Sequence, residues 1–281
     1  MKINMTGKTC LVTGANSGIG KVTAEVLARE GARVVIVCRN RERAQPALEE
    51  IKKKSGNREV ELMTCDFASQ KQIRRLVDEF LSNYDRLDVL VNNAGLMRRH
   101  RETTEDGLEM TFAVNHLGYF LLTNLLLDVL KDSAPSRIVN VASVAHIRGT
   151  INFDDLQGER EYSSMAAYRQ SKLANILFTY ELARRLEGTL VTVNCLHPGV
   201  IATNIARDMP KAVVFALKLF FTGAEKGAET SLYLATSPDV ETVTGKYFAD
   251  KKEARSNRES YDEEIARRLW AVSARLAGLE E

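Results

Sequence analysis

The sequence predicts an α/β protein: a single-domain, doubly wound (Rossmann-type) parallel sheet of about seven strands flanked by helices. Short β-branched runs alternate with longer segments of helical periodicity, which is typical of βαβ units. Several runs are apolar at consecutive positions, as in Val34–Val37, and this indicates strands covered on both faces. The predicted strands are Thr9–Val12, Arg33–Cys38, Glu59–Cys65, Leu87–Val91, Arg137–Val141, Val191–Leu196 and Gly245–Phe248.

Helices are predicted between these strands from periodicity and from capping residues. Asn40 and Gly56 are suited to cap a helix over Arg41–Ser55. Ser69 with Gln72, and Ser260 with Glu263, match the capping box at a helix start. No repeat or Pro/Gly-rich linker interrupts the chain, so we expect one domain over 1–281. The other predicted helices are Ser17–Glu30, Thr111–Lys131 and Ser164–Arg185, and the last one ends near Leu276.

Composition excludes several classes of protein. Hydrophobic residues make up 44% of the 281 residues, which is too apolar for a disordered chain. The net charge of +2 lacks the basic excess expected of a nucleic-acid-binding protein. The four cysteines are far apart and form no CxxC motif, so we expect neither a zinc site nor disulfides, and a reducing compartment. They are Cys10, Cys38, Cys65 and Cys195.

No membrane-spanning segment or signal peptide is expected. Met1–Thr6 lacks a basic region followed by an apolar one. The longest nearly unbroken apolar stretch, Ala212–Phe221, has ten residues and is interrupted by Lys218, whereas a bilayer core needs roughly 20. These observations predict a cytoplasmic protein, with peripheral membrane contact left open.

A glycine-rich turn follows the first predicted strand and opens the first helix. Glycines let the backbone turn tightly and let a phosphate approach the helix N-terminus, where free N–H groups favour negative charge. The spacing is GxxxGxG rather than GxGxxG, and a turn without ligand is the structural alternative. The candidate nucleotide-binding residues here are Gly14, Asn16, Ser17, Gly18, Ile19 and Gly20.

The end of the second predicted strand favours NADP(H) over NAD. Many dinucleotide-binding folds place a carboxylate about 20 residues after the glycines to bind the ribose. Here Arg39 and Asn40 stand at that place, with no acid from Arg33 through Arg41. A guanidinium can instead pair with a 2′-phosphate, although a solvated surface arginine is the alternative. Asp66, after the third strand, is a weaker candidate that can equally be a loop cap.

Tyr168 and Lys172 share one face of a predicted helix because they are four residues apart. A tyrosine with a pKa near 10 transfers protons poorly at neutral pH unless a cation stabilises its phenolate, and a lysine one turn away supplies that cation. Chance pairing on a surface is the alternative. Among Tyr84, Tyr119, Tyr162, Tyr168 and Tyr180, only Tyr168 has a lysine at the fourth following position.

Two further polar residues are candidates for the same site. Ser143 comes just after the fifth strand, at the sheet edge where ligands bind parallel sheets. Asn115 lies in a long apolar helix, where an amide is costly without a partner. A turn serine and a satisfied core asparagine are the alternatives. Asn92 to Gly95, after the fourth strand, can also be a simple turn.

Taken together, these motifs resemble the short-chain dehydrogenase/reductase family over essentially the whole chain. They are TGANSGIG, NNAG, Asn115, Ser143, Tyr168-x-x-x-Lys172 and Pro198-Gly199, in this order. Three segments resemble the retinol dehydrogenase branch of this family: Ser143–His146, Tyr168–Asn175 and the region 225–252. Protochlorophyllide reductases are close relatives of that branch.

The resemblance implies roles for these residues. Tyr168 would be the general acid in carbonyl reduction and the base in alcohol oxidation, and Lys172 would lower its pKa and bind the nicotinamide ribose. Ser143 would orient the substrate oxygen, and Asn115 would hold a water that links Lys172 to solvent. The implied lining of the NADP(H) site adds Arg39, Asp66, Asn92, Ala94, Gly95, Pro198, Gly199 and Thr203 to the glycine-rich turn.

The resemblance also implies a substrate region, a lid at about 200–225 that is rich in apolar residues. Such a lid suits a lipophilic aldehyde, ketone or alcohol of the retinal/retinol kind, although simple packing or membrane contact are alternatives. A protochlorophyllide reductase-like enzyme and a non-catalytic NADP-sensing interaction protein are the other functions considered. No metal is expected, and a homodimer is left open.

Overall fold

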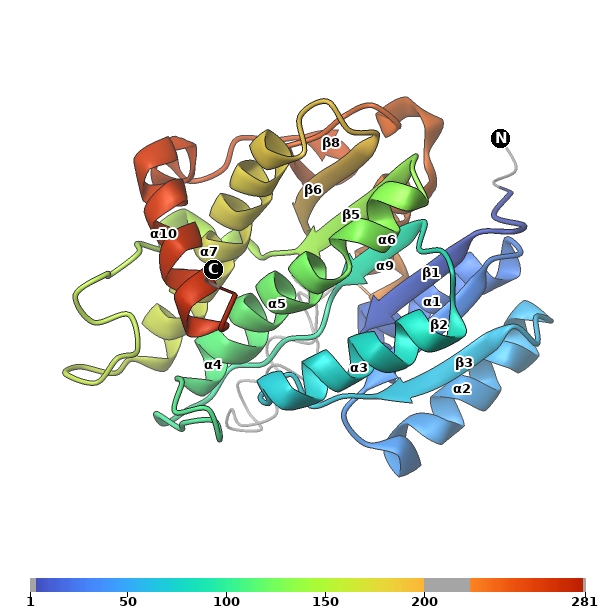
Figure 1. The fold of residues 1–281 in the computed structure, drawn as a ribbon, viewed down its shortest axis with the longest axis horizontal. Helices are drawn as coiled ribbons and strands as arrows, with labels where there is room; N and C mark the ends of the chain where they lie inside the picture. Colours follow the sequence, from blue (N-terminus) through green and yellow to red (C-terminus); the bar gives the residue numbers. More distant parts are fainter. Residues whose placement is uncertain (1–3, 200–222, 280–281) are drawn as a thin grey trace.

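The computed structural model describes residues 4–199 and 223–279, and it places eight strands in one sheet with the order β3-β2-β1-β4-β5-β6-β7-β8 (Figure 1). β1 to β7 pair in parallel, and the short β8 pairs antiparallel with β7. The predicted parallel α/β fold is therefore confirmed, with an added edge strand. The strands are β1 Thr9–Thr13, β2 Arg33–Cys38, β3 Val60–Thr64, β4 Val89–Asn92, β5 Ser136–Val141, β6 Val191–His197, β7 Tyr247–Ala249 and β8 Lys252–Glu253.

Helices cover both faces of the sheet (Figure 1). One apolar core lies under α1 and α2, with α9 beside them, and a second lies under α3, α5 and α7. The helices are α1 Gly18–Arg29, α2 Arg41–Ser55, α3 Gln70–Asn83, α4 Met110–Phe112, α5 Gly118–Leu125, α6 Leu127–Asp132, α7 Ser164–Arg185, α9 Ala224–Thr236 and α10 Glu263–Leu276. Shorter turns are η1 Ala113–Leu117, η2 Val144–Arg148, η4 Pro238–Val240 and η5 Arg258–Tyr261.

The order of the strands reverses between β1 and β4, because β2 and β3 lie on one side of β1 and all later strands lie on the other. In open parallel sheets the loops diverge at such a point and leave a crevice at the carboxyl ends of the strands. The glycine-rich turn follows β1, and the NNAG segment follows β4, so the two predicted motifs meet at this crevice.

The capping residues in the sequence correctly predict both ends of α2 and the start of α3. The Asn40 side chain accepts a 2.8 Å hydrogen bond from the backbone N–H of Arg43, and Gly56 ends α2 with φ of 70°. Ser69 accepts a hydrogen bond from the N–H of Gln72, as predicted. The Gln72 side chain, however, accepts from the N–H of Asp66 instead of completing the capping box.

The predicted helix over Thr111–Lys131 is not continuous. The chain instead forms the single turn α4, a π-helical turn η1, then α5 and α6, with a break at Leu126. The π-turn includes Asn115, whose side chain forms hydrogen bonds with the backbone of Leu96 outside the helix. These bonds favour the departure from α geometry at this turn. Apolar periodicity alone does not distinguish these geometries.

The predicted start of the last helix is also corrected. Asp262, not Ser260, is the N-cap of α10, and its side chain accepts hydrogen bonds from the N–H groups of Glu264 and Ile265. Ser260 belongs to η5 and donates to the backbone carbonyl of Asn257. All four cysteines are buried, as expected for small core side chains.

Candidate active site at the carboxyl ends of the strands

The glycine-rich turn after β1 leaves the N-terminus of α1 open. Gly14 and Gly18 both have positive φ, 67° and 57°, which favours glycine at these positions. A Cβ on Gly18 would meet no atom within 4 Å beyond the adjacent residues, so this part of the turn is accessible. The first turn of α1 contains no acidic residue that would compete with an anion for its N–H groups.

The NNAG segment after β4 holds this turn in place. The Asn93 amide donates to the carbonyl oxygens of Thr13 and Gly14 at 2.8 and 3.3 Å. The Thr13 hydroxyl oxygen accepts from the N–H groups of Asn93 and Ala94 at 2.8 and 2.9 Å. A Cβ on Gly14 would lie 2.9 Å from the Cα of Ala94, so a larger residue would push the segments apart. Sequence reasoning assigned no role to Thr13 or Asn93.

Arg39 and Asp66 lie together at the ends of β2 and β3. Arg39 is 58% exposed at its side chain, Asp66 is 33% exposed, and their charged atoms are 4.0 Å apart. The guanidinium therefore stands at the carboxyl edge of the sheet, as predicted, in reach of a carboxylate. Asn40 uses its side-chain oxygen to cap α2, so it has only its amide N–H groups to offer a ligand.

Asn92 lies behind the crevice rather than on its surface. It is fully buried, and its amide donates to Thr123 and to Asn140, both at 2.9 Å. These bonds tie the end of β4 to β5 and α5. A contact of its side chain with the cofactor remains a prediction. Ala94 and Gly95 follow at the more open side of the segment.

Tyr168, Lys172 and Ser143 come together as the sequence predicts. The Lys172 Nζ lies 5.8 Å from the centroid of the Tyr168 ring and donates a 3.0 Å hydrogen bond to the carbonyl oxygen of Val141. The Ser143 hydroxyl lies near the Tyr168 phenol and acts to lower its pKa. Its oxygen also accepts from the N–H of Ala145, which leaves the hydroxyl proton available for donation.

Burial dominates the titration of this pair. Burial raises the pKa of Tyr168, and the Ser143 hydroxyl only partly offsets this increase. Burial also lowers the pKa of Lys172 to about 7. Desolvation disfavours the charged form of each group, so near neutral pH the phenol is protonated and the lysine is poised between its two forms. A lowering of the Tyr168 pKa by Lys172 remains a prediction.

Asn115 is fully buried beside the same lysine. Its amide donates to the carbonyl oxygen of Leu96 at 2.9 Å and to the Ser171 hydroxyl at 3.0 Å, and its oxygen accepts from the N–H of Leu96. A Cβ on Gly95 would lie 3.3 Å from the Asn115 Oδ1 and 3.6 Å from the Lys172 Nζ. The amide is thus satisfied by protein atoms, and it joins the Leu96 loop to α7.

His146 supports Ser143 in a way that sequence reasoning missed. Its Nδ1 lies 2.6 Å from the carbonyl oxygen of Ser143, and its ring packs edge-on against Tyr247 on β7. The His197 ring, at the end of β6, also lies against Tyr247, and its Nδ1 accepts from the N–H of Gly199. A histidine three residues after a candidate serine was the available signal.

Some predicted features fall outside the described residues. Pro198 and Gly199 follow β6 at the carboxyl edge of the sheet, with φ of 87° at Gly199. Thr203, the apolar stretch Ala212–Phe221 and most of the predicted lid at 200–225 lie outside the described residues. Within the described part, no group of histidine, cysteine or carboxylate side chains is arranged to hold a metal ion. No helix among residues 4–199 and 223–279 is long and apolar enough to cross a membrane.

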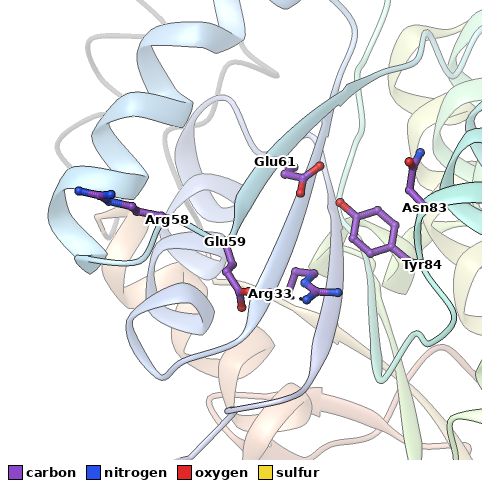
Figure 2. A pocket seen from close by; sticks show the side chains of 6 residues that line it. All are labelled: Arg33, Arg58, Glu59, Glu61, Asn83 and Tyr84. Carbon is purple, nitrogen blue, oxygen red and sulfur yellow. Dashed lines mark ion pairs between the residues drawn. The ribbon is translucent and has the colours of Figure 1, made fainter.

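A hollow of about 330 Å³ lies at the opposite end of the sheet (Figure 2). It is lined by residues at the amino ends of β2 and β3, where Arg33 pairs with Glu59 at 3.6 Å, and by Tyr84 after α3. Figure 2 shows the Tyr84 hydroxyl directed toward Glu61. Since ligands of parallel sheets bind at the carboxyl ends, this hollow is separate from the candidate active site.

Comparisons with known proteins agree with this geometry. The short chain dehydrogenase family model matches residues 8–213. Human retinol dehydrogenase 14 is 50% identical, covering 98% of this chain and 88% of its own. Human retinol dehydrogenase 13 is 49% identical, and the match covers 99% of this chain and 87% of that protein.

Solved structures show the same fold. An uncharacterized protein from Mycobacterium Paratuberculosis is 35% identical with a TM-score of 0.82, covering 99% of this chain and 96% of its own. The RhlG/NADP active-site complex from Pseudomonas aeruginosa is 26% identical with a TM-score of 0.72. The match covers 88% of this chain and 96% of that chain.

The fold and the site define an oxidoreductase that acts on CH–OH and C=O groups with a nicotinamide cofactor. The chain belongs to the short-chain dehydrogenase family, and within it to the retinol dehydrogenase branch.

Proposed function

We propose that the protein is an NADP(H)-dependent oxidoreductase that transfers a hydride between the cofactor and a lipophilic aldehyde or ketone, or the corresponding alcohol, of the retinal/retinol kind. The observation that carries this proposal is the buried pair of Tyr168 and Lys172 next to the partly exposed Ser143, at the same carboxyl edge of the sheet as the glycine-rich turn before α1. We further propose a cytoplasmic location.

The described residues fit a dinucleotide phosphate. The N-terminus of α1 offers backbone N–H groups with no acidic side chain in the first turn, and Gly18 leaves room for close approach. The exposed Arg39 offers a guanidinium for a 2′-phosphate. When bound, the cofactor supplies or accepts the hydride. The NADP complex of the Pseudomonas aeruginosa relative supports the choice of NADP(H).

The protein's own contribution is positioning and proton transfer. The Ser143 hydroxyl donates to the substrate oxygen, and this holds the carbonyl next to Tyr168 and stabilises negative charge as it develops. The raised pKa of Tyr168 keeps its phenol protonated, so its hydroxyl gives a proton to that oxygen in reduction and takes one back in oxidation. Lys172, near its midpoint at neutral pH, replaces the proton that Tyr168 gives up.

Apolar side chains near the site support a lipophilic substrate. Val144 and Ile147 on η2 follow Ser143, Met165 precedes Tyr168 on α7, and all three are exposed, with Ile147 at 55%. Large exposed apolar side chains that gather at one place favour a binding surface. The names of the human relatives, retinol dehydrogenases 13 and 14, support a retinoid-like compound as substrate.

A panel of carbonyl compounds tests this function. Purified protein is mixed with NADPH or NADH and with aldehydes and ketones that range from short aliphatic chains to retinal, and the decrease in cofactor absorbance is followed. We expect turnover that is fastest with NADPH and a long apolar aldehyde, and that is lost in Tyr168→Phe. Turnover of no carbonyl compound, or equal turnover in Tyr168→Phe, would contradict the proposal.

A further inference from the structure

A buried histidine connects the catalytic region to the C-terminal helix. His116, in the π-turn η1, is fully buried, and its Nε2 lies 2.8 Å from the hydroxyl oxygen of Ser273 on α10. Ser273 is itself fully buried. The two residues are 157 positions apart in the sequence, so this hydrogen bond joins distant parts of the chain. None of the roles assigned above uses it.

Aromatic side chains hold the imidazole from the other sides. The His116 ring lies 4.9 Å from the ring of Phe112, and Phe120 and Phe178 lie at 6.3 and 6.2 Å. Trp270, one turn before Ser273 on α10, packs against the rings of Phe120 and Phe178. The contacts fix the position of α10 on this face of the protein, while the hydrogen bond to Ser273 fixes the rotation of the ring.

His116 has no role in proton transfer at neutral pH. Burial lowers the pKa of His116 to about 3, and the neighbouring Asn175 amide opposes this decrease. Burial is the main cause of this shift, so the ring is neutral near pH 7. His116 therefore contributes to the site by holding neighbouring residues in position.

The position matters because His116 directly follows Asn115. The Asn115 side chain bonds to Leu96 and Ser171 in the π-helical arrangement of η1, and its oxygen lies near Lys172. A π-turn contains one more residue than an α-helical turn, so relaxation to α geometry would rotate the residues on one side of it by roughly 100°. Asn115 would then lose its bonds to Leu96 and Ser171.

Resting on the proposed function, we propose that His116 is a positioning residue: its hydrogen bond to Ser273 of α10 locks the π-turn that holds Asn115 against Ser171 and beside Lys172. The C-terminal helix is then part of the structure that aligns the catalytic residues. Asn175, three residues after Lys172 on α7, lies next to the His116 ring.

The test is Ser273→Ala, with Ser273→Thr as the variant that keeps the hydroxyl. The control is Arg74→Ala, because Arg74 on α3 donates to the carbonyl oxygens of Ala277 and Gly278, one turn after Ser273, and so ties the C-terminal end of α10 to α3 rather than to η1. Two quantities are measured: backbone hydrogen exchange over residues 113–118 without nucleotide, and kcat with saturating NADPH and the best carbonyl substrate.

Loss of a buried hydrogen bond should speed exchange over 113–118 by about 5- to 150-fold in Ser273→Ala. We expect kcat to fall about 10-fold, on the same energetic basis, while the affinity for NADPH stays within about twofold. Ser273→Thr should restore both quantities. Arg74→Ala should leave both near wild type, although it lowers thermal stability. If Ser273→Ala does not fold, Ser273→Cys, which keeps a weaker donor, should give intermediate values.

Two outcomes would overturn the inference: unchanged exchange and kcat in Ser273→Ala, or equal effects in Arg74→Ala. Failure of the proposed function is distinguishable, because wild-type protein would then turn over no carbonyl compound. The exchange measurement uses no substrate and is independent of that result.

Discussion

The Lys172 ammonium group donates a 3.0 Å hydrogen bond to the carbonyl oxygen of Val141, two residues before Ser143. This bond anchors the middle of α7 to the end of β5, and so it fixes the distance between the strand that leads to Ser143 and the helix that carries Tyr168. Lys172 is only 3% exposed. One carbonyl does not replace the water that a lysine loses on burial, and this explains why its pKa falls to about 7.

The first prediction follows from that pKa. The pKa of Lys172 is about 7 in the folded protein, below its usual 10.5, so between these values the unfolded chain binds more protons at this position. Burial of the charge therefore destabilises the folded protein at and below pH 7, and the penalty disappears as pH rises to about 10. Lys172→Met removes the penalty, so its free energy of unfolding relative to wild type should decrease steadily from pH 7 to pH 10.

Urea unfolding of nucleotide-free protein at a series of pH values measures this difference. Lys53→Met, at an exposed position on α2, is the control and should show no such slope. Parallel stability curves for wild type and Lys172→Met would mean that the lysine is not desolvated as the structure indicates.

The second prediction concerns proton transfer by Tyr168. Tyr168→Phe removes only the phenolic oxygen, so the cofactor should still bind while kcat falls by about 10²- to 10⁴-fold, the usual contribution of a general acid or base. Tyr180→Phe is a matched control on the same helix. The Tyr180 hydroxyl bonds to Ser256, away from the catalytic set, and its loss should leave kcat near wild type. Similar kcat values in the two variants would exclude Tyr168 as the proton donor.

Much of the fold could be predicted because local signals and packing agree. β2, α2 and α7 have the predicted bounds, and in α2 the cap residues Asn40 and Gly56 act as expected. The π-turn at Asn115 could not be predicted, because it depends on bonds to Leu96 and Ser171 that only the folded chain brings together. For the same reason β8, two residues long and paired only with β7, was not expected.

The candidate site was predictable where chemistry demands a particular residue type. Tyr168, Lys172 and Ser143 were found from spacing and strand ends, and the structure brings them together. Asn93, Thr13 and His146 were missed, because each acts through backbone atoms of residues that are neighbours only across the sheet or through a turn. Apart from the histidine three residues after Ser143, such roles leave no distinctive spacing in the sequence.

The third prediction concerns one of these missed residues. The Asn93 amide bonds to the carbonyl oxygens of Thr13 and Gly14 and so holds the glycine-rich turn in shape. Asn93→Ala leaves these groups without a partner, which costs about 1–3 kcal/mol. Part of this cost should appear as weaker nucleotide binding, by about 5- to 100-fold. The dissociation constant is measured by fluorescence titration, with the exposed Asn83→Ala as control. Unchanged affinity would show that the turn keeps its shape without Asn93.

The last prediction concerns cofactor choice, which depends on one exposed charge at the end of β2. Arg39 pairs only loosely with Asp66, at 4.0 Å, so its guanidinium can turn toward a 2′-phosphate at little cost. Charge-assisted hydrogen bonds of this kind are worth roughly 1.5–3 kcal/mol, so we expect NADPH to bind about 10- to 150-fold more tightly than NADH. Arg39→Gln removes the charge and should erase the preference. Arg39→Asp should reverse it, because two carboxylates would then repel the phosphate and one could accept from a ribose hydroxyl. Arg43→Ala, in the first turn of α2, measures how much this second arginine contributes to the preference for NADPH. Both cofactors are titrated against each variant, and equal affinities of the wild type for NADPH and NADH would refute the assignment of Arg39.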